Sequence, residues 1–191
     1  MDYSFYALMF RMKYIERWSL MRCNIKENLS EHSLETALIA HALAEIGNTY
    51  FDKNYDAERI ALKALYHDAT EIMTGDLPTP VKYYDNNIRS AYAAVERCAE
   101  TKILSLLPEE LKGNYSQLFE LSTDEKLLIK SADKLCAYIK CALEVSSGNN
   151  EFTHAEKVTK EALESNPCEE LKYFCAKFLD AFFQPLDNIS L

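Results

Sequence analysis

The sequence predicts an all-α protein, a single bundle of about seven or eight helices. Only 4 Gly and 5 Pro interrupt its 191 residues, which leaves long stretches free to form regular helix. Ala, Leu, Glu and Lys, which all favour helix, are abundant, and apolar residues recur at helical spacing nearly throughout. Since 48% of the residues are hydrophobic, the chain can fill a core, and we expect one domain over 1–191.

The first long helix is expected to begin at Ser30, a residue type that caps helices. Its apolar side chains form two stripes, Leu34, Leu38 and Ala42 on one and Ile39, Leu43 and Ile46 on the other. Because both stripes are apolar, this helix should be buried. A second helix is expected over 56–73. It must stop there, since Gly75, Pro78 and Pro80 cannot continue a helix.

The remaining helices are recognised by their ends. Residues 88–106 repeat the helical pattern of apolar residues. Ser122, with Glu125 three residues later, is the signature of a capping box and begins a long helix. Gly148 and the two Asn that follow it end that helix. The last helix begins in the run 166–169, which contains Asn, Pro and Glu.

The net charge of the chain limits the kinds of molecule that it can bind. It carries 30 acidic and 21 basic side chains, a formal net charge of −9 at pH 7. A long nucleic acid would meet a repulsive field rather than a basic face, so we exclude it as a partner. Small phosphorylated molecules remain candidates, because two or three local Arg or Lys side chains can outweigh a distant net charge.

The cysteines and the apolar runs indicate the compartment. The six cysteines form no CxxC pair, and nothing that resembles a secretory leader precedes them. No apolar run approaches the roughly 18 residues that are needed to span a bilayer. We therefore expect a soluble cytoplasmic protein with reduced thiols and no membrane partner.

Two segments carry polar side chains where the helical pattern expects apolar ones. In the helix that starts near Ser122, Asp133 falls in an apolar stripe with Ile129, Ala132, Cys136 and Leu143. A carboxylate there needs a partner, because an unpaired charge in apolar surroundings is costly. In the helix over 56–73, His67 and Asp68 project side by side, and Glu71 lies one turn further on.

These polar residues suit a metal ion. His32 opens the helix that precedes His67 and Asp68, so its ring can face them across a helix contact. With Asp133 they make two imidazoles and two carboxylates from three helices, a set that suits a divalent first-row ion. Because no thiolate contributes, Mn²⁺, Co²⁺ or Fe²⁺ is at least as natural there as Zn²⁺. Glu71 and Asp76 can act as acid–base groups without being ligands.

Spacing alone leaves structural alternatives open. A hydrogen bond between His67 and Asp68 can simply hold the end of a helix, because such a pair also arises by chance. Asp133 can be one half of a buried ion pair with an Arg. On the residues alone, the metal site and these structural roles therefore stand side by side.

The order of the candidate residues resembles that of a known superfamily. His32, the pair His67-Asp68 and Asp133 resemble the H…HD…D metal set of the HD-domain phosphohydrolases, which are all-helical. More narrowly, several segments resemble bacterial 5'-deoxynucleotidases of the YfbR type: RW at 17–18, NLSEHS at 28–33, YHDATE at 66–71, TGDLPTPVKY at 74–83 and KSAD at 130–133. The resemblance covers about 5–185, which would be the core of a single HD domain.

The resemblance implies an activity and a set of site residues. The activity is hydrolysis of deoxyribonucleoside 5'-monophosphates by a homodimer that needs a divalent metal cation, Co²⁺ or Mn²⁺ first, with Zn²⁺, Fe²⁺, Ni²⁺ and Cu²⁺ as further candidates. The implied metal ligands are His32, His67, Asp68 and Asp133. Glu71 and Asp76 would be catalytic, together with Arg17, which would orient the phosphate. The implied substrate-binding residues are Arg17, Trp18, His32, Asp68, Asp76, Leu77, Pro78, Thr79 and Asp133.

Within that set, Trp18 has two interpretations. The resemblance implies that its indole walls the sugar. It lies near the end of an expected apolar first helix, however, so it can also be a core residue.

Two other functions remain in competition with the first. Another HD-domain nucleotide phosphohydrolase, a phosphodiesterase or a nucleoside triphosphate hydrolase, would use the same four ligands. A triphosphatase should place several basic side chains near the site, yet few candidates appear beyond Arg17, Arg22 and Lys82. A non-catalytic helical interaction module would leave Glu71 and Asp76 without a role. We therefore rank 5'-deoxynucleotidase activity first.

Overall fold

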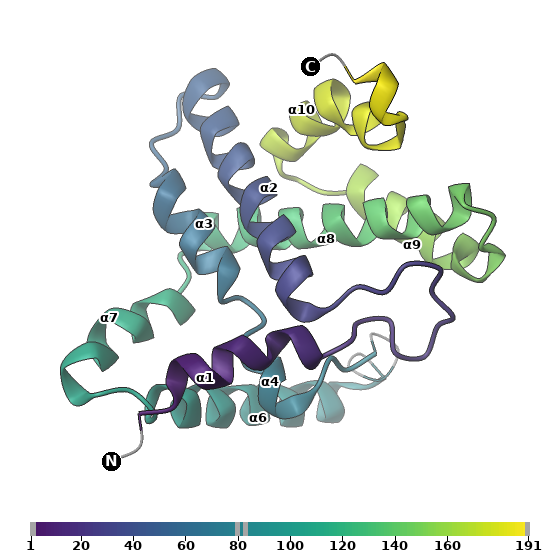
Figure 1. The fold of residues 1–191 in the computed structure, drawn as a ribbon. Coiled ribbons are helices and arrows are strands. Elements are labelled where there is room, and N and C mark those ends of the chain that lie inside the picture. The colour runs from purple at the N-terminus through teal and green to yellow at the C-terminus, as the bar shows by residue number, and fades with distance from the viewer. Residues whose placement is uncertain (1–2, 79–80, 82–83, 190–191) are drawn as a thin grey trace. The chain divides into compact units, whose positions relative to one another are not determined.

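The computed structural model describes residues 3–78, 81 and 84–189, and its regular structure is helical (Figure 1). The α-helices in these ranges are α1 (Phe5–Met9), α2 (Leu29–Tyr50), α3 (Ala57–Leu65), α4 (Glu71–Thr74), α6 (Asn86–Leu104), α7 (Glu109–Phe119), α8 (Thr123–Ser146), α9 (Thr153–Glu164) and α10 (Glu169–Phe178). The 3₁₀ helices are η1 (Phe10–Tyr14), η2 (Asn150–Phe152), η3 (Leu179–Phe183) and η4 (Leu186–Asn188). Seven of these α-helices have nine or more residues. The predicted all-α class is therefore confirmed.

The chain divides into two compact units. Unit 1 consists of Met1–Leu34 and Leu65–Leu121, and unit 2 consists of Glu35–Ala64 and Ser122–Leu191. The single domain expected over 1–191 stays a prediction. In the part of the chain that the structure describes, no helix combines the length and the apolar character needed to cross a membrane.

Helix α2 is capped by Asn28, two residues before the expected cap Ser30, and begins at Leu29. The Asn28 side chain accepts hydrogen bonds from the backbone N–H groups of Ser30 and Glu31, at 3.0 and 3.1 Å. In return, Glu31 Oε2 accepts the Asn28 N–H at 3.0 Å. This reciprocal capping box satisfies the first N–H groups of the helix. It places His32 in the first turn of α2.

The predicted burial of α2 on both stripes is wrong. Ile39, Leu43 and Ile46 are buried, but Leu34 and Leu38 are 55% and 64% exposed. Small residues complete the buried face instead, namely Thr36, Ala37, Ala40 and Ala44. Since small side chains let a neighbouring element approach closely, burial of α2 does not need the Leu stripe.

The helix expected over 56–73 is broken in the middle. Helix α3 ends at Leu65 and α4 begins at Glu71, with a turn over 66–70 between them. Hydrogen bonds in this turn connect residues three apart, as from Ala69 N–H to Tyr66 O at 3.1 Å and from Glu71 N–H to Asp68 O at 2.9 Å. The tighter turn changes the direction in which His67 and Asp68 point. Helix α4 then ends before Gly75, whose φ of 73° favours glycine, as the sequence predicts.

The core of unit 1 lies between α1, α6 and α7. Phe5, Ile103 and Leu107 are buried together there, and Tyr66 packs against them. Helix α4 packs against α6 and η1 (Figure 1). The residue just before the His67-Asp68 pair is thus anchored in an apolar core.

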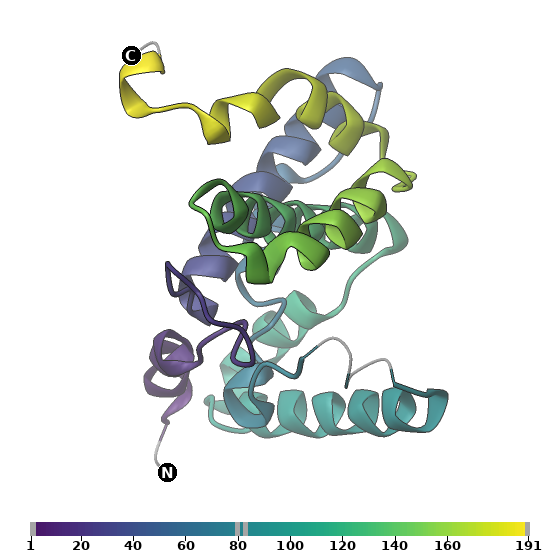
Figure 2. The same ribbon diagram turned by 90° about the vertical axis from the view of Figure 1, so that its right-hand side faces the viewer.

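Unit 2 is organised around α8. The predicted capping box is confirmed, because the Ser122 side chain accepts the Glu125 N–H while the Glu125 side chain accepts the Ser122 N–H. Helix α8 ends at Ser146, and Gly148 follows with a φ of 85°, as predicted. Helices α8 and α9 lie side by side (Figure 2), and α8 also contacts α10 and η2.

Candidate active site

The turn at 66–70 brings two chemically active side chains together. His67 Nε2 lies 3.1 Å from Asp68 Oδ2, and their side chains are 11% and 21% exposed. The Tyr66 ring stacks on Phe5 with a centroid distance of 6.5 Å and meets the Tyr115 ring edge-on at 6.2 Å. Because Tyr66 is held on these rings, the turn that carries the next two residues is anchored in the core of unit 1.

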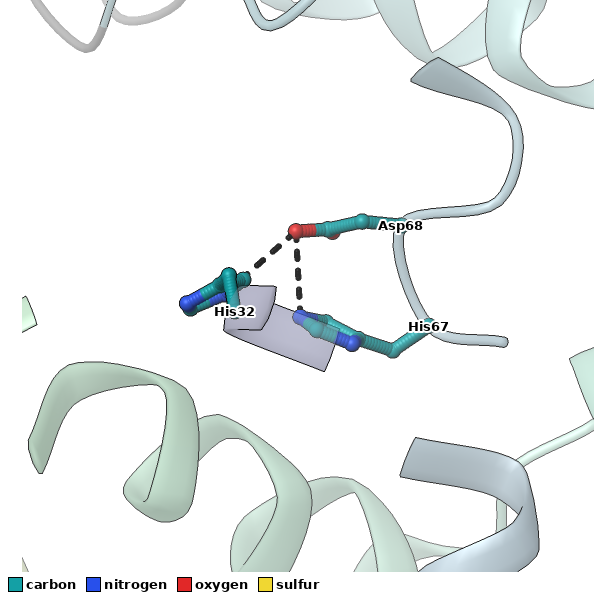
Figure 3. Close-up of side chains that lie close together, drawn as sticks. All are labelled: His32, His67 and Asp68. Atoms are coloured by element: carbon teal, nitrogen blue, oxygen red, sulfur yellow. Dashed lines mark ion pairs between the residues drawn. The ribbon is translucent and has the colours of Figure 1, made fainter. Parts of the chain in front are cut away.

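His32 completes a cluster with this pair. Its side chain is fully buried, its Nε2 lies 3.7 Å from Asp68 Oδ2, and its ring centroid is 5.3 Å from that of His67. Figure 3 shows the two imidazoles converging on the same carboxylate oxygen. One ligand atom from each of the three residues lies within 4.8 Å of the others. Such an arrangement can hold a metal ion.

The charges around Asp68 keep it ionised. Burial raises the pKa of the Asp68 carboxyl, but the neighbouring His67, His32 and Arg17 lower that pKa by a larger amount. The net pKa therefore lies well below the ordinary value. Arg17 Nη1 lies 3.4 Å from Asp68 Oδ2. Asp68 is therefore an anionic carboxylate next to two imidazoles and a guanidinium.

Arg17 and Trp18 reach the cluster through a short backbone pairing. Arg17 N–H donates to Glu27 O at 3.0 Å, and Leu29 N–H donates to Ile15 O at 2.9 Å. The expectation of Trp18 near the end of a first helix is wrong, since η1 ends at Tyr14 and Trp18 has a φ of 58°. The half-buried Trp18 is also not a core residue. A bend after the paired segment sets its position.

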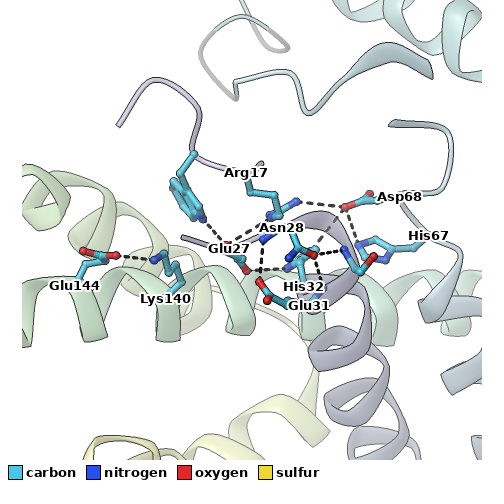
Figure 4. A network of polar contacts seen from close by, with 11 residues as sticks. Arg17, Glu27, Asn28, Glu31, His32, His67, Asp68, Lys140 and Glu144 are labelled. Carbon is cyan, nitrogen blue, oxygen red and sulfur yellow. Dashed lines mark hydrogen bonds and ion pairs between the residues drawn. The ribbon is translucent and has the colours of Figure 1, made fainter. Parts of the chain in front are cut away.

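Sequence reasoning missed Glu27. This buried carboxylate accepts the indole N–H of Trp18 on Oε2 at 2.6 Å, and the same oxygen lies 3.7 Å from Arg17 Nε. Its Oε1 lies 3.5 Å from His32 Nδ1 (Figure 4). Burial raises the pKa of Glu27, yet the nearby ring of His32 and the charge of Arg17 bring that pKa below the ordinary value. No periodicity or motif singles out this residue, which precedes a helix cap in a charged stretch.

Glu71 and Asp76, the expected acid–base groups, lie in the chain that follows the turn. Glu71 is the first residue of α4 and is buried, at 5% exposure. Asp76 is half-buried. Burial raises the pKa of Asp76, and the charge of Asp68 adds to this, although Arg17 and a hydrogen bond with the Trp18 backbone oppose it. The net pKa is above the ordinary value, so Asp76 keeps a proton more readily than an exposed Asp.

The structure describes the positions of some, but not all, of the other expected site residues. Leu77 and Pro78 are half-buried, while Thr79 lies outside the described residues. Asp133 is half-buried on α8 in unit 2, in register with the buried residues Ile129, Ala132 and Cys136. Its assignment as a fourth ligand stays a prediction.

Comparison with solved structures shows which fold the chain has. An HD-domain phosphohydrolase from Listeria innocua has the same fold, with a TM-score of 0.82 at 22% sequence identity, covering 94% of this chain and 88% of that one. In this chain, the helical fold carries the cluster of His32, His67 and Asp68. The class that this comparison defines is therefore the all-helical fold which this chain shares with that phosphohydrolase.

Sequence comparison then identifies the family. The family model described as 5'-deoxynucleotidase YfbR-like matches residues 4–182. A 5'-deoxynucleotidase of Enterobacter sp. strain 638 is 50% identical, and the 5'-deoxynucleotidase YfbR of Escherichia coli ATCC 8739 is 48% identical. Both matches cover 97% of this chain and 95% of the relative. The chain therefore belongs to the YfbR-like 5'-deoxynucleotidase family.

Proposed function

We propose that the substrate is a deoxyribonucleoside 5'-monophosphate and that the products are a deoxynucleoside and phosphate. As a member of the 5'-deoxynucleotidase family, the protein is a phosphoric monoester hydrolase. The observation that carries the proposal is the contact of Arg17 with the cluster, 3.4 Å from Nη1 to Asp68 Oδ2. A forked cation beside a candidate metal site suits a phosphate group, which can bind to both.

We infer that His32, His67 and Asp68, with Asp133 of α8 as a fourth ligand, hold a divalent metal cation as cofactor. The donor chemistry fits, because imidazole nitrogen and carboxylate oxygen without thiolate suit first-row ions. The geometry also fits, since the ligand atoms of the first three residues lie within 4.8 Å of one another. Co²⁺ and Mn²⁺ are the first candidates, and Zn²⁺, Fe²⁺, Ni²⁺ and Cu²⁺ are further ones. A bound ion supplies Lewis acidity toward a phosphate oxygen and toward water.

Arg17 orients the phosphate. Its guanidinium carries five N–H donors in a rigid plane, and the carboxylates of Asp68 and Glu27 hold that plane from two sides. A phosphate that binds to Arg17 is then presented next to Asp68. Holding the reacting group in one orientation removes part of the entropy barrier to hydrolysis.

Glu71 and Asp76 divide the proton transfers between them. Asp76 keeps a proton more readily than an exposed Asp, which suits the group that protonates the departing 5'-oxygen. Glu71, buried on α4 next to the turn, then accepts the proton of the attacking water. Two carboxyl groups in different surroundings thus serve as acid and base.

The nucleoside is recognised by the segments on either side of this chemistry. Trp18 packs against the deoxyribose, and the loop of Asp76, Leu77, Pro78 and Thr79 contacts the nucleoside. We also propose that the protein acts as a homodimer in the cytoplasm. Light scattering on the purified protein measures its mass and tests the dimer.

A substrate screen tests the proposed reaction. The protein, supplemented with Mn²⁺ or Co²⁺, is incubated with dAMP, AMP, dATP and a cyclic nucleotide; phosphate release is measured, and chromatography identifies the nucleotides and nucleosides that are consumed and formed. We expect release from dAMP to exceed release from the other three. Hydrolysis of dATP or of the cyclic nucleotide in preference to dAMP would favour a triphosphatase or a phosphodiesterase. A protein that releases phosphate from none of them would contradict the proposal.

A further inference from the structure

Glu27 contacts three residues that have separate proposed tasks. One oxygen of its carboxylate bonds to Trp18 and approaches Arg17, while the other approaches His32 (Figure 4). Trp18 and Arg17 are proposed to bind substrate, and His32 is proposed to bind metal. A single buried side chain therefore touches both halves of the site.

The contact with His32 determines which ring nitrogen can bind a metal. A carboxylate only accepts hydrogen bonds, so the nitrogen that faces it, Nδ1, carries the proton in the neutral ring. The other nitrogen, Nε2, then has a lone pair, and Nε2 is the atom that lies 3.7 Å from Asp68 Oδ2. Carboxylates behind metal-binding histidines act in this way in many metal sites.

The contacts of Glu27 with Trp18 and Arg17 fix the conformation of the backbone segment that carries these two residues. Trp18 has a φ of 58°, a backbone conformation that a bulky residue adopts only where its surroundings enforce it. Its indole N–H bond to Glu27, at 2.6 Å, provides that constraint. The backbone pairing of Arg17 with Glu27 holds the same two segments together.

We propose that Glu27 is a positioning residue that presents His32 Nε2 to the metal and holds Arg17 and Trp18 where the phosphate and the sugar bind. The second half of this role rests on the proposed function. The first half requires only that the cluster binds a divalent ion.

The variant Glu27→Gln tests the proposal, because it keeps the shape of the side chain and changes the hydrogen bonds. If the amide oxygen accepts from Trp18, the amide N–H₂ faces His32 Nδ1 and favours the ring form with its proton on Nε2. If the amide turns over, its N–H₂ faces the donors of Trp18 and Arg17. The first orientation weakens metal binding by His32. The second removes the acceptor that holds Trp18 and Arg17.

The matched control is Glu31→Gln, the same change four residues later. Glu31 is exposed and accepts the Asn28 N–H in the capping box of α2, a position in which Gln serves equally well. This control removes one negative charge near the cluster and keeps the start of α2. Both halves of the site should be unaffected.

Two measurements on the purified proteins separate the outcomes. Calorimetric titration of the metal-free proteins with Mn²⁺ should show affinity about 10- to 100-fold weaker for Glu27→Gln and unchanged for Glu31→Gln. With Mn²⁺ at saturation, KM for dAMP should rise roughly tenfold in Glu27→Gln, with a smaller change in kcat. Wild-type Mn²⁺ affinity together with a wild-type KM for dAMP in Glu27→Gln would overturn the proposal. Weaker Mn²⁺ binding by the variant, with a wild type that does not hydrolyse dAMP, would contradict only the proposed function.

If Glu27→Gln does not fold, the wild-type protein decides the question. Nuclear magnetic resonance of the metal-free protein with ¹⁵N-labelled histidine distinguishes the two neutral ring forms, and a single substitution assigns the signals of His32. We expect the proton of neutral His32 on Nδ1. A proton on Nε2 would refute the positioning role.

Discussion

The individual residues of the site include a cation that lies close to two anions. The guanidinium of Arg17 lies between two carboxylates, 3.4 Å from Asp68 Oδ2 and 3.7 Å from Glu27 Oε2. Both carboxyl groups consequently have a pKa below the ordinary value in spite of their burial. Near neutral pH both are charged acceptors, as required for a metal ligand and for a histidine partner.

The first residue-scale prediction concerns the metal ligands. His67→Ala and Asp133→Ala should each remove bound metal and nearly all phosphate release from dAMP, because each removes one proposed ligand. Elemental analysis of the purified variants measures this. The control is His154→Ala, which changes an exposed histidine of α9. Full metal content and full activity in either ligand variant would disprove that assignment.

The second concerns Glu71 as a proton-transfer group. Glu71→Gln should keep metal and substrate binding but lose about 10²- to 10⁴-fold in turnover, since an amide cannot carry the proton. Turnover of dAMP and calorimetric titration with dAMP are measured side by side. Glu58→Gln, at an exposed position in the first turn of α3, is the control. Unchanged turnover in Glu71→Gln would rule out the catalytic role.

The third concerns Trp18 and the sugar. An apolar pocket discriminates against one added hydroxyl by only about 10²-fold, so a rigid indole against C2' must add steric exclusion. Trp18→Ala should then relax the preference for dAMP over AMP, mainly by raising AMP turnover, while metal content is kept. Values of kcat/KM for both nucleotides are compared. Equal fractional losses for the two would show that Trp18 supports the site without recognising the sugar.

At the scale of elements, local caps and turns place the functional side chains. The capping box of Asn28 and Glu31 sets the first turn of α2, and His32 belongs to that turn. The aromatic contacts of Tyr66 hold the turn that carries His67 and Asp68. The cluster therefore lies at the ends of helices. The direction of its side chains is set there by the hydrogen bonds of the α2 cap and by the ring of Tyr66.

The element-scale prediction concerns the cap of α8, the helix that carries Asp133. Ser122→Ala removes the acceptor of the Glu125 N–H and should lower the free energy of unfolding by about 1 kcal/mol. Urea denaturation of the metal-free protein measures it. Ser146→Ala, near the other end of α8, should change stability by less than about 0.5 kcal/mol. Equal effects of the two changes would contradict the role of the cap.

At the scale of the whole molecule, metal binding and stability should be linked. A ligand that binds only the folded protein at about 100 times its Kd adds roughly 2.7 kcal/mol of stability. For a chain of 191 residues this corresponds to a rise in Tm of roughly 5–10 °C. Melts with Mn²⁺ and with a chelator measure the shift. The shift should disappear in His67→Ala, and its persistence there would locate the metal elsewhere.

Features that depend on neighbours along the chain could be predicted from the sequence. The helical class follows from periodicity, and the cap at Ser122 and the end at Gly148 follow from short-range backbone chemistry. The order of His32, His67 and Asp68 indicated the superfamily only. The segments RW at 17–18 and TGDLPTPVKY at 74–83 indicated the family, which the family model and the curated relatives confirmed. Periodicity could not detect the break at 66–70, because the apolar pattern continues across it.

Features that depend on contacts between residues far apart in the sequence could be seen only in the folded structure. The turn at 66–70 is held by rings from other segments of unit 1, and Leu34 is exposed because no element covers it in the described part of that unit. Glu27 joins the site because a backbone pairing brings it to Arg17 and a helix start brings it to His32. Long-range contacts of this kind leave no periodic trace in a sequence, since each depends on how the whole chain is folded.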